Sequence, residues 1–64
     1  MPLSMVKAGE PNVIKKVGGK FLENLGFVVG GLVTVISEIN GSLIVNVKDS
    51  RVAIGKDMAN KILV

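Results

Sequence analysis

The hydroxyl side chains of this sequence have no obvious partner that would turn them into nucleophiles. Nucleophilic catalysis needs a serine, threonine or cysteine beside a general base. The chain has no cysteine and no histidine, so only a lysine remains as a base. The residue types therefore argue against nucleophilic catalysis by any of the five hydroxyls, which are Ser4, Thr34, Ser37, Ser42 and Ser50.

The carboxylates are isolated as well, because no two of them are near neighbours in the sequence. General acid–base catalysis needs a carboxyl group whose pKa is shifted in a pocket, and a domain of 64 residues has no room for a deep one. Transition metals favour histidine and cysteine, so at most a loose carboxylate site for a hard cation remains. We therefore expect no enzyme, no cofactor and no metal site from the five acidic residues, which are Glu10, Glu23, Glu38, Asp49 and Asp57.

Two glycine pairs invite comparison with phosphate-binding loops. Gly18-Gly19-Lys20 has part of the motif G-x-x-x-x-G-K-[ST], but the remainder is absent. We interpret this segment and Gly30-Gly31 as turns, because glycine alone adopts a positive φ without steric cost.

Residues 1–64 are long enough for one small domain, which must be stabilised by packing because disulfides and zinc sites are excluded. Hydrophobic residues make up 48% of the chain and are mostly valine, isoleucine and leucine, which favours strands. A domain of this size buries only about 60% of its unfolded surface. We therefore expect some apolar side chains to stay outside, as a contact patch or an interface of a homo-oligomer.

The net charge is +3, from eight basic and five acidic residues, and Lys15, Lys16 and Lys20 lie close together. We interpret this cluster as a solvated face that keeps the protein soluble. A nucleic-acid surface normally interleaves basic residues with aromatic ones. The two aromatic residues are Phe21 and Phe27, which we place on or next to a helix, so we expect no nucleic-acid binding.

The sequence also predicts a cytoplasmic protein without direct insertion into a membrane. Met1-Pro2-Leu3-Ser4 lacks the basic and apolar regions of a signal peptide. The longest uncharged run, Leu25 to Ser37, contains three glycines and is shorter than the roughly 20 residues of a spanning helix.

A hairpin at Asn40-Gly41 is the clearest structural signal, because this dipeptide suits a type I′ turn. Its arms are Leu32–Ile39 and Ser42–Lys48. The odd-numbered residues of the second arm are apolar and should face the core. The first arm is apolar on both faces, as expected of a strand that is covered on both sides.

The other elements are shorter. We expect strands at Asn12–Val17, Arg51–Ile54 and Lys61–Val64, with helical turns at Lys20–Leu25 and Lys56–Asn60. Gly26 should cap the first helix, with Phe27 closing the cap, while Leu3 and Val6 pin the N-terminal arm. These elements predict a mainly β fold, a small partly open barrel of about five strands with a short helical insertion. The predicted core contains Ile14, Val33, Val35, Val45, Val47, Ile54 and Ile62.

Several short segments form an ordered set along nearly the whole chain. They are Val6-Lys7-Ala8-Gly9, Ile14-Lys15-Lys16-Val17-Gly18-Gly19, Phe21-Leu22-Glu23-Asn24-Leu25-Gly26-Phe27, Gly30, Val33, Val35, Val45-Asn46-Val47, Arg51-Val52-Ala53-Ile54, Ala59, Ile62 and Val64. None is specific by itself, but in this order they resemble the FeoA family, ferrous iron transport protein A.

This resemblance implies an SH3-like barrel with a short helical insertion. It also implies a small cytoplasmic accessory or regulatory protein that contacts FeoB, the membrane ferrous-iron transporter with a cytosolic GTP-binding domain. The same module occurs fused to metal-dependent repressors, so the fold alone does not determine the partner. A nucleic-acid-binding barrel and an interaction module of another system remain alternatives.

One connection departs from the family pattern. Family members usually have several more polar residues between the glycine pair and the first helix, where this chain has only Lys20. We therefore expect either a truncated helix or a missing loop. We predict the second case, in which the Cα atoms at Gly19–Lys20 or Lys20–Phe21 lie several ångströms farther apart than the roughly 3.8 Å of a trans peptide.

For the partner-binding surface we predict four residues near the helix and at one strand start. Phe21, Phe27 and Val28 are expected to be exposed, because the segment holds more apolar side chains than one short helix can bury. Arg51 is expected to act as a polar anchor, because its planar guanidinium can hold a carboxylate or a carbonyl.

Overall fold

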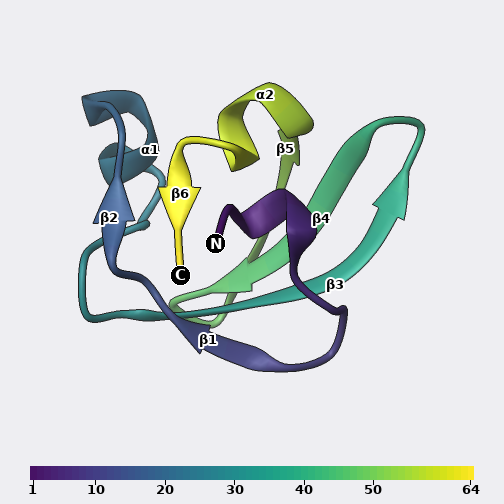
Figure 1. Ribbon diagram of the computed structural model, residues 1–64, viewed down its shortest axis with the longest axis horizontal. Helices are drawn as coiled ribbons and strands as arrows, with labels where there is room; N and C mark the ends of the chain where they lie inside the picture. The colour runs from purple at the N-terminus through teal and green to yellow at the C-terminus, as the bar shows by residue number, and fades with distance from the viewer.

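The computed structural model describes all residues from 1 to 64 and is mainly β, as predicted (Figure 1). Strands β1, β3, β4 and β5 form an antiparallel sheet in that order, and β2 pairs with β6 in a second sheet. Both sheets close around one core as a small, partly open barrel. In chain order the elements are the 3₁₀ helix η1 (Leu3–Met5), β1 (Pro11–Val13), β2 (Lys16–Val17), α1 (Lys20–Asn24), β3 (Leu32–Ile39), β4 (Ser42–Val47), β5 (Ser50–Gly55), α2 (Lys56–Ala59) and β6 (Ile62–Leu63).

The predicted hairpin is present between β3 and β4. Asn40 and Gly41 have φ angles of 50° and 82°, and Ile39 stands opposite Ser42 across the turn. A two-residue loop with positive φ at both positions is a type I′ turn, whose twist matches that of the strands. The Asn40-Gly41 signal therefore predicted correctly where the chain turns between β3 and β4.

The core contains all seven residues that the sequence predicted for it, and each of them is buried. Leu3 and Ala59 join them from the N-terminal arm and from α2. Alternation in β4 places Leu43, Val45 and Val47 inside, as expected for a strand with one buried face.

The predicted strand Asn12–Val17 is wrong as a single element, because it is two strands in different sheets. β1 pairs with β3, whereas β2 pairs with β6. Between them Ile14 is buried, its N–H donates to the carbonyl of Gly31 (2.9 Å), and its carbonyl accepts from the N–H of Gly30 (2.8 Å). The chain changes sheet here, which explains why Ile14 and Val17 both point inward although they lie three residues apart.

The expectation that β3 is covered on both sides is also wrong. Its even-numbered face is open, with Leu32 and Ile36 exposed, while Val33 and Val35 are buried. The register shifts between Val35 and Ser37, so that Ile36 is the extra residue of a bulge. A chain of this length has no second layer to lay over the outer face of the four-stranded sheet.

Helix α1 has five residues, and the backbone continues without interruption from Gly19 (φ 124°, ψ 147°) into Lys20, its first residue. The predicted widening of the chain path at this point is therefore wrong. The helix ends in a complete Schellman motif: Gly26 has φ 110° and donates to the carbonyl of Glu23 (3.0 Å), and Phe27 donates to that of Leu22 (3.1 Å).

The two termini lie side by side next to β6 (Figure 1). The N–H of Val64 donates to the carbonyl of Met1 (2.8 Å), and the terminal amine donates back to the carbonyl of Val64 (3.0 Å). Pro2 and Leu63 form a β-bridge. Neither helix has the length and hydropathy needed to cross a bilayer.

Candidate functional site

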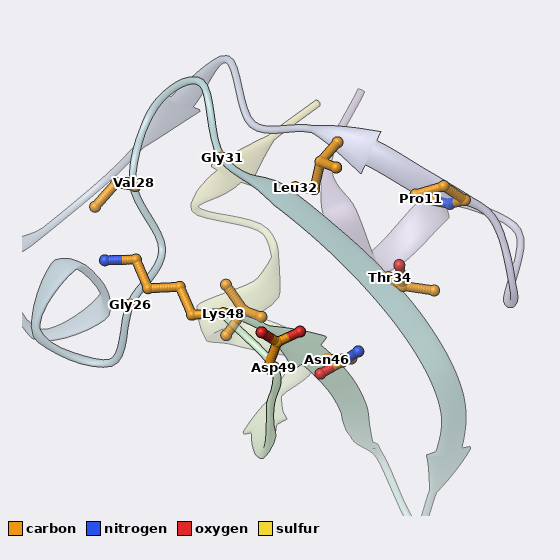
Figure 2. A pocket seen from close by; sticks show the side chains of 10 residues that line it. Pro11, Gly26, Val28, Gly31, Leu32, Thr34, Asn46, Lys48 and Asp49 are labelled. Carbon is orange, nitrogen blue, oxygen red and sulfur yellow. The ribbon is translucent and has the colours of Figure 1, made fainter.

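An open groove of about 350 Å³ runs over the outer face of the four-stranded sheet (Figure 2). One wall is the loop between α1 and β3, and one end is closed by the turn between β4 and β5. Three of its ten lining residues are hydrophobic. The lining residues are Pro11, Gly26, Val28, Gly31, Leu32, Thr34, Asn46, Val47, Lys48 and Asp49.

A single row of side chains crosses the sheet and forms the floor of the groove. Pro11 stands opposite Thr34, Thr34 opposite Asn46, and Asn46 opposite Arg51. Residues that face each other across antiparallel strands project to the same side. The row is therefore continuous from β1 to β5, with Arg51 at its outer end.

The wall beside α1 depends on glycine. Gly26 adopts φ 110° as part of the helix cap, and the side chain of Lys48 lies across it, with its Cδ 3.6 Å from where a Cβ would be. Farther along, the N–H of Gly31 donates to the carbonyl of Val28 (3.0 Å), which closes a tight turn. This turn holds Val28 at the mouth of the groove, 37% exposed.

The end of the groove is a second type I′ turn with less suitable residues. Lys48 and Asp49 have φ angles of 50° and 62°, and Val47 stands opposite Ser50. Side chains other than asparagine, aspartate and glycine adopt this conformation at a cost of about 1–2 kcal/mol per residue. The two charged side chains of this turn diverge: Lys48 extends along the wall toward Gly26, whereas the Asp49 carboxylate lies on the side of Asn46 (Figure 2).

These features suit a contact surface better than a reaction centre. The groove combines hydrogen-bonding groups on its floor with apolar side chains at its rim, as protein interfaces do. The one salt bridge, between Lys56 and Glu38 (2.9 Å), joins residues that do not line it. Nowhere do three or more carboxylates, histidines or cysteines gather as ligands for a metal ion.

The four residues predicted for partner binding do not share one place. Val28 lines the groove, and Arg51 extends its floor. Phe21 is 61% exposed on α1 but does not line the groove. The predicted exposure of Phe27 is wrong, because its side chain is fully buried (0%). As the last residue of the Schellman motif it packs inward with Leu22.

The sequence reasoning missed most of the groove. Leu32, Thr34, Asn46, Lys48 and Asp49 were not predicted as site residues, although all five line it. The hairpin pattern could have predicted part of it. Side chains alternate along a strand, so the even-numbered residues of both arms, which do not enter the core, share the outer face of the sheet. The contribution of the α1–β3 loop had no such signal.

Fold and site together define a small β-barrel domain with an open groove on one sheet face. The model of the FeoA domain family matches residues 1–64, the whole chain, which therefore belongs to the FeoA family. This family takes part in ferrous iron transport.

A relative from Methanocaldococcus jannaschii, named "Putative Fe(2+) transport protein A", is 35% identical over 68 residues. The match covers 98% of this chain and 83% of that protein. The fold is similar to the crystal structure of an iron uptake regulatory protein (FeoA), with a TM-score of 0.85 and 26% sequence identity. That similarity covers 95% of this chain and 88% of the other.

Proposed function

We propose that this protein is a cytoplasmic accessory protein of ferrous iron uptake that acts by binding the cytosolic part of the FeoB transporter. Membership of the FeoA family supports the transport process. The observation that carries the mode of action is the groove, which joins exposed apolar residues to a row of polar ones on one open sheet face.

The apolar rim of the groove, which we define as Val13, Val28 and Leu32, is the expected centre of the contact. Val13 stands directly opposite Leu32 in the β1–β3 ladder, and both side chains are more than half exposed. Apolar side chains in such positions gain free energy when a partner removes them from water. The rim therefore supplies affinity.

The polar row supplies orientation. Asn46 and Thr34 offer a hydrogen-bonding floor, and Arg51 offers a guanidinium at its end. Groups of this kind select a partner by the position of its carbonyls and carboxylates rather than by area. A segment of the transporter that lies along the groove would meet the rim and the row together.

Titration of the cytosolic domain of FeoB with this protein, followed by calorimetry, tests the proposal. We expect saturable binding with modest dependence on salt, and at least fivefold weaker binding for Leu32→Ser, because truncation of a central apolar contact costs more than about 1 kcal/mol. Ile39→Ser is the matched control, because Ile39 is equally apolar and more than half exposed but lies at the end of β3 beside the hairpin turn.

Two outcomes would contradict the proposal. The first is no binding of the FeoB domain by a folded protein. The second is equal weakening by Leu32→Ser and Ile39→Ser, which would remove the groove from the interface. Affinity for single-stranded RNA or DNA that falls steeply with salt would favour the nucleic-acid alternative instead.

A further inference from the structure

Half of the basic residues gather on one side of the molecule, away from the groove. Lys15 and Lys16 lie at β2, Lys20 opens α1, and Lys61 immediately precedes β6. These three elements lie side by side in Figure 1. We call Lys15, Lys16, Lys20 and Lys61 the lysine patch; it holds four of the eight basic residues of the chain.

The β2–β6 ladder brings part of the patch onto one surface. Val17 stands opposite the fully buried Ile62, so the neighbouring positions Lys16 and Lys61 project to the outer face. The backbone N–H of Gly18 donates to the carbonyl of Lys61 (2.8 Å). The side chain of Lys61 lies over Gly18, its Cβ 3.3 Å from where a glycine Cβ would be, which places it beside the turn into α1.

The charge of the patch is not neutralised within the protein. All four lysines are exposed, and none of them forms a salt bridge. Glu23 is the one acidic residue on these elements, and it makes no ion pair with Lys20. Such a surface attracts a negatively charged partner and loses that attraction when salt screens it.

One aromatic side chain stands beside these charges. Phe21 follows Lys20 at the start of α1 and is 61% exposed, whereas the other aromatic residue, Phe27, is buried. Lysines next to an exposed aromatic ring are typical of surfaces that lie on lipid, because the ring enters the boundary region while the ammonium groups meet the headgroups.

We propose that the lysine patch and Phe21 form a docking surface for an anionic lipid bilayer. The choice of lysine supports lipid over an acidic protein segment. An arginine fork recognises discrete carboxylates, whereas a lysine is a point charge on a flexible stem, which suits a diffuse layer of headgroups. The single arginine of the chain, Arg51, lies instead at the groove, so the two surfaces can be occupied at the same time.

This inference goes beyond the proposed contact with FeoB and is tested without that protein. The protein is mixed with vesicles of phosphatidylcholine and phosphatidylglycerol in equal parts, or of phosphatidylcholine alone, and then sedimented. We expect binding to the mixed vesicles only, and its loss at high salt, since the screening length falls to about 3 Å at 1 M.

Matched variants test the location of the surface. Each lysine near an anionic membrane contributes about a fivefold increase in binding, so Lys16→Gln with Lys20→Gln should weaken it by about 25-fold. Lys7→Gln with Lys56→Gln removes the same charge from the N-terminal arm and from the start of α2, where Lys56 pairs with Glu38 of β3, and should weaken it much less. Equal weakening by both pairs would show that only net charge matters and would overturn the proposal, as would equal binding to neutral vesicles or no binding to mixed ones.

A fluorescent reporter tests the contact of α1 with lipid. The chain has no tryptophan and no tyrosine, so Phe21→Trp introduces a single emitter. Its emission should shift to the blue when mixed vesicles are added. Ile39→Trp is the control, because the β3–β4 hairpin lies on the opposite side of the molecule from α1 (Figure 1). A blue shift for Ile39→Trp and none for Phe21→Trp would overturn the proposed orientation.

Discussion

Arg51 stands directly opposite Asn46 across the β4–β5 ladder, at the outer end of the floor of the groove. Asn46 lines the groove, so this cross-strand pair places the arginine of the edge strand β5 next to the groove. Because the guanidinium is exposed and has no salt-bridge partner in the protein, it is free to bind a partner group.

Arg51→Ala is therefore expected to weaken binding of the FeoB cytosolic domain by about tenfold, because arginine is enriched among the few interface residues that contribute most of the affinity. The thermal midpoint should change little, because the exposed side chain makes no hydrogen bond or salt bridge within the protein. Calorimetric titration measures the affinity. Lys7→Ala serves as a control of equal charge, and an equal loss for both variants would exclude a specific role for Arg51.

The two phenylalanines should respond in opposite ways to truncation. Phe27→Ala removes a fully buried ring, at a cost of about 3–5 kcal/mol, which is most of the stability of a domain this small. Phe21→Ala should change the free energy of unfolding by no more than about 0.5 kcal/mol. Urea unfolding followed by circular dichroism distinguishes them, and similar losses for both would contradict the burial pattern.

Glycine at position 26 is required by the backbone conformation. Gly26→Ala should cost about 1–2 kcal/mol, because φ is 110° at the C-terminal cap of α1. Gly55→Ala is the matched control: Gly55 has φ −70° and open space where a Cβ would be, so the entropic gain of about 0.4–1 kcal/mol should offset the poorer N-cap of α2 and leave stability nearly unchanged. Destabilisation by both variants to the same extent would refute this account.

The turn at Lys48-Asp49 should be open to improvement. Replacing it by Asn-Gly, the preferred type I′ pair, is expected to raise the free energy of unfolding by about 1 kcal/mol. The reverse change, Asn40→Lys in the other hairpin, should lower it by a similar amount, since both turns have positive φ angles. Denaturant titration checks both, and a loss of stability in the improved turn would mean that Lys48 makes a contact that outweighs its strain.

The sequence by itself determined the features that rest on local chemistry. Asn40-Gly41 specified the central hairpin, alternation in β4 specified which side chains enter the core, and Gly26 specified the end of α1. Each of these signals acts over a few residues, where backbone sterics and periodicity decide the outcome. The ordered set of segments was also sufficient to indicate the FeoA family, which the family model confirms.

Tertiary structure alone decided the rest. The change of sheet at Ile14 depends on hydrogen bonds to Gly30 and Gly31, which are sixteen and seventeen positions away in the numbering and give no local signal. The burial of Phe27 depends on how the cap of α1 turns it toward the core, and the open face at Leu32 depends on the absence of a covering layer. At such positions long-range packing overrides the local pattern, because the burial of a side chain depends on which distant segments pack against it. The groove depends on the complete fold for the same reason, since its lining residues come from segments far apart in the sequence.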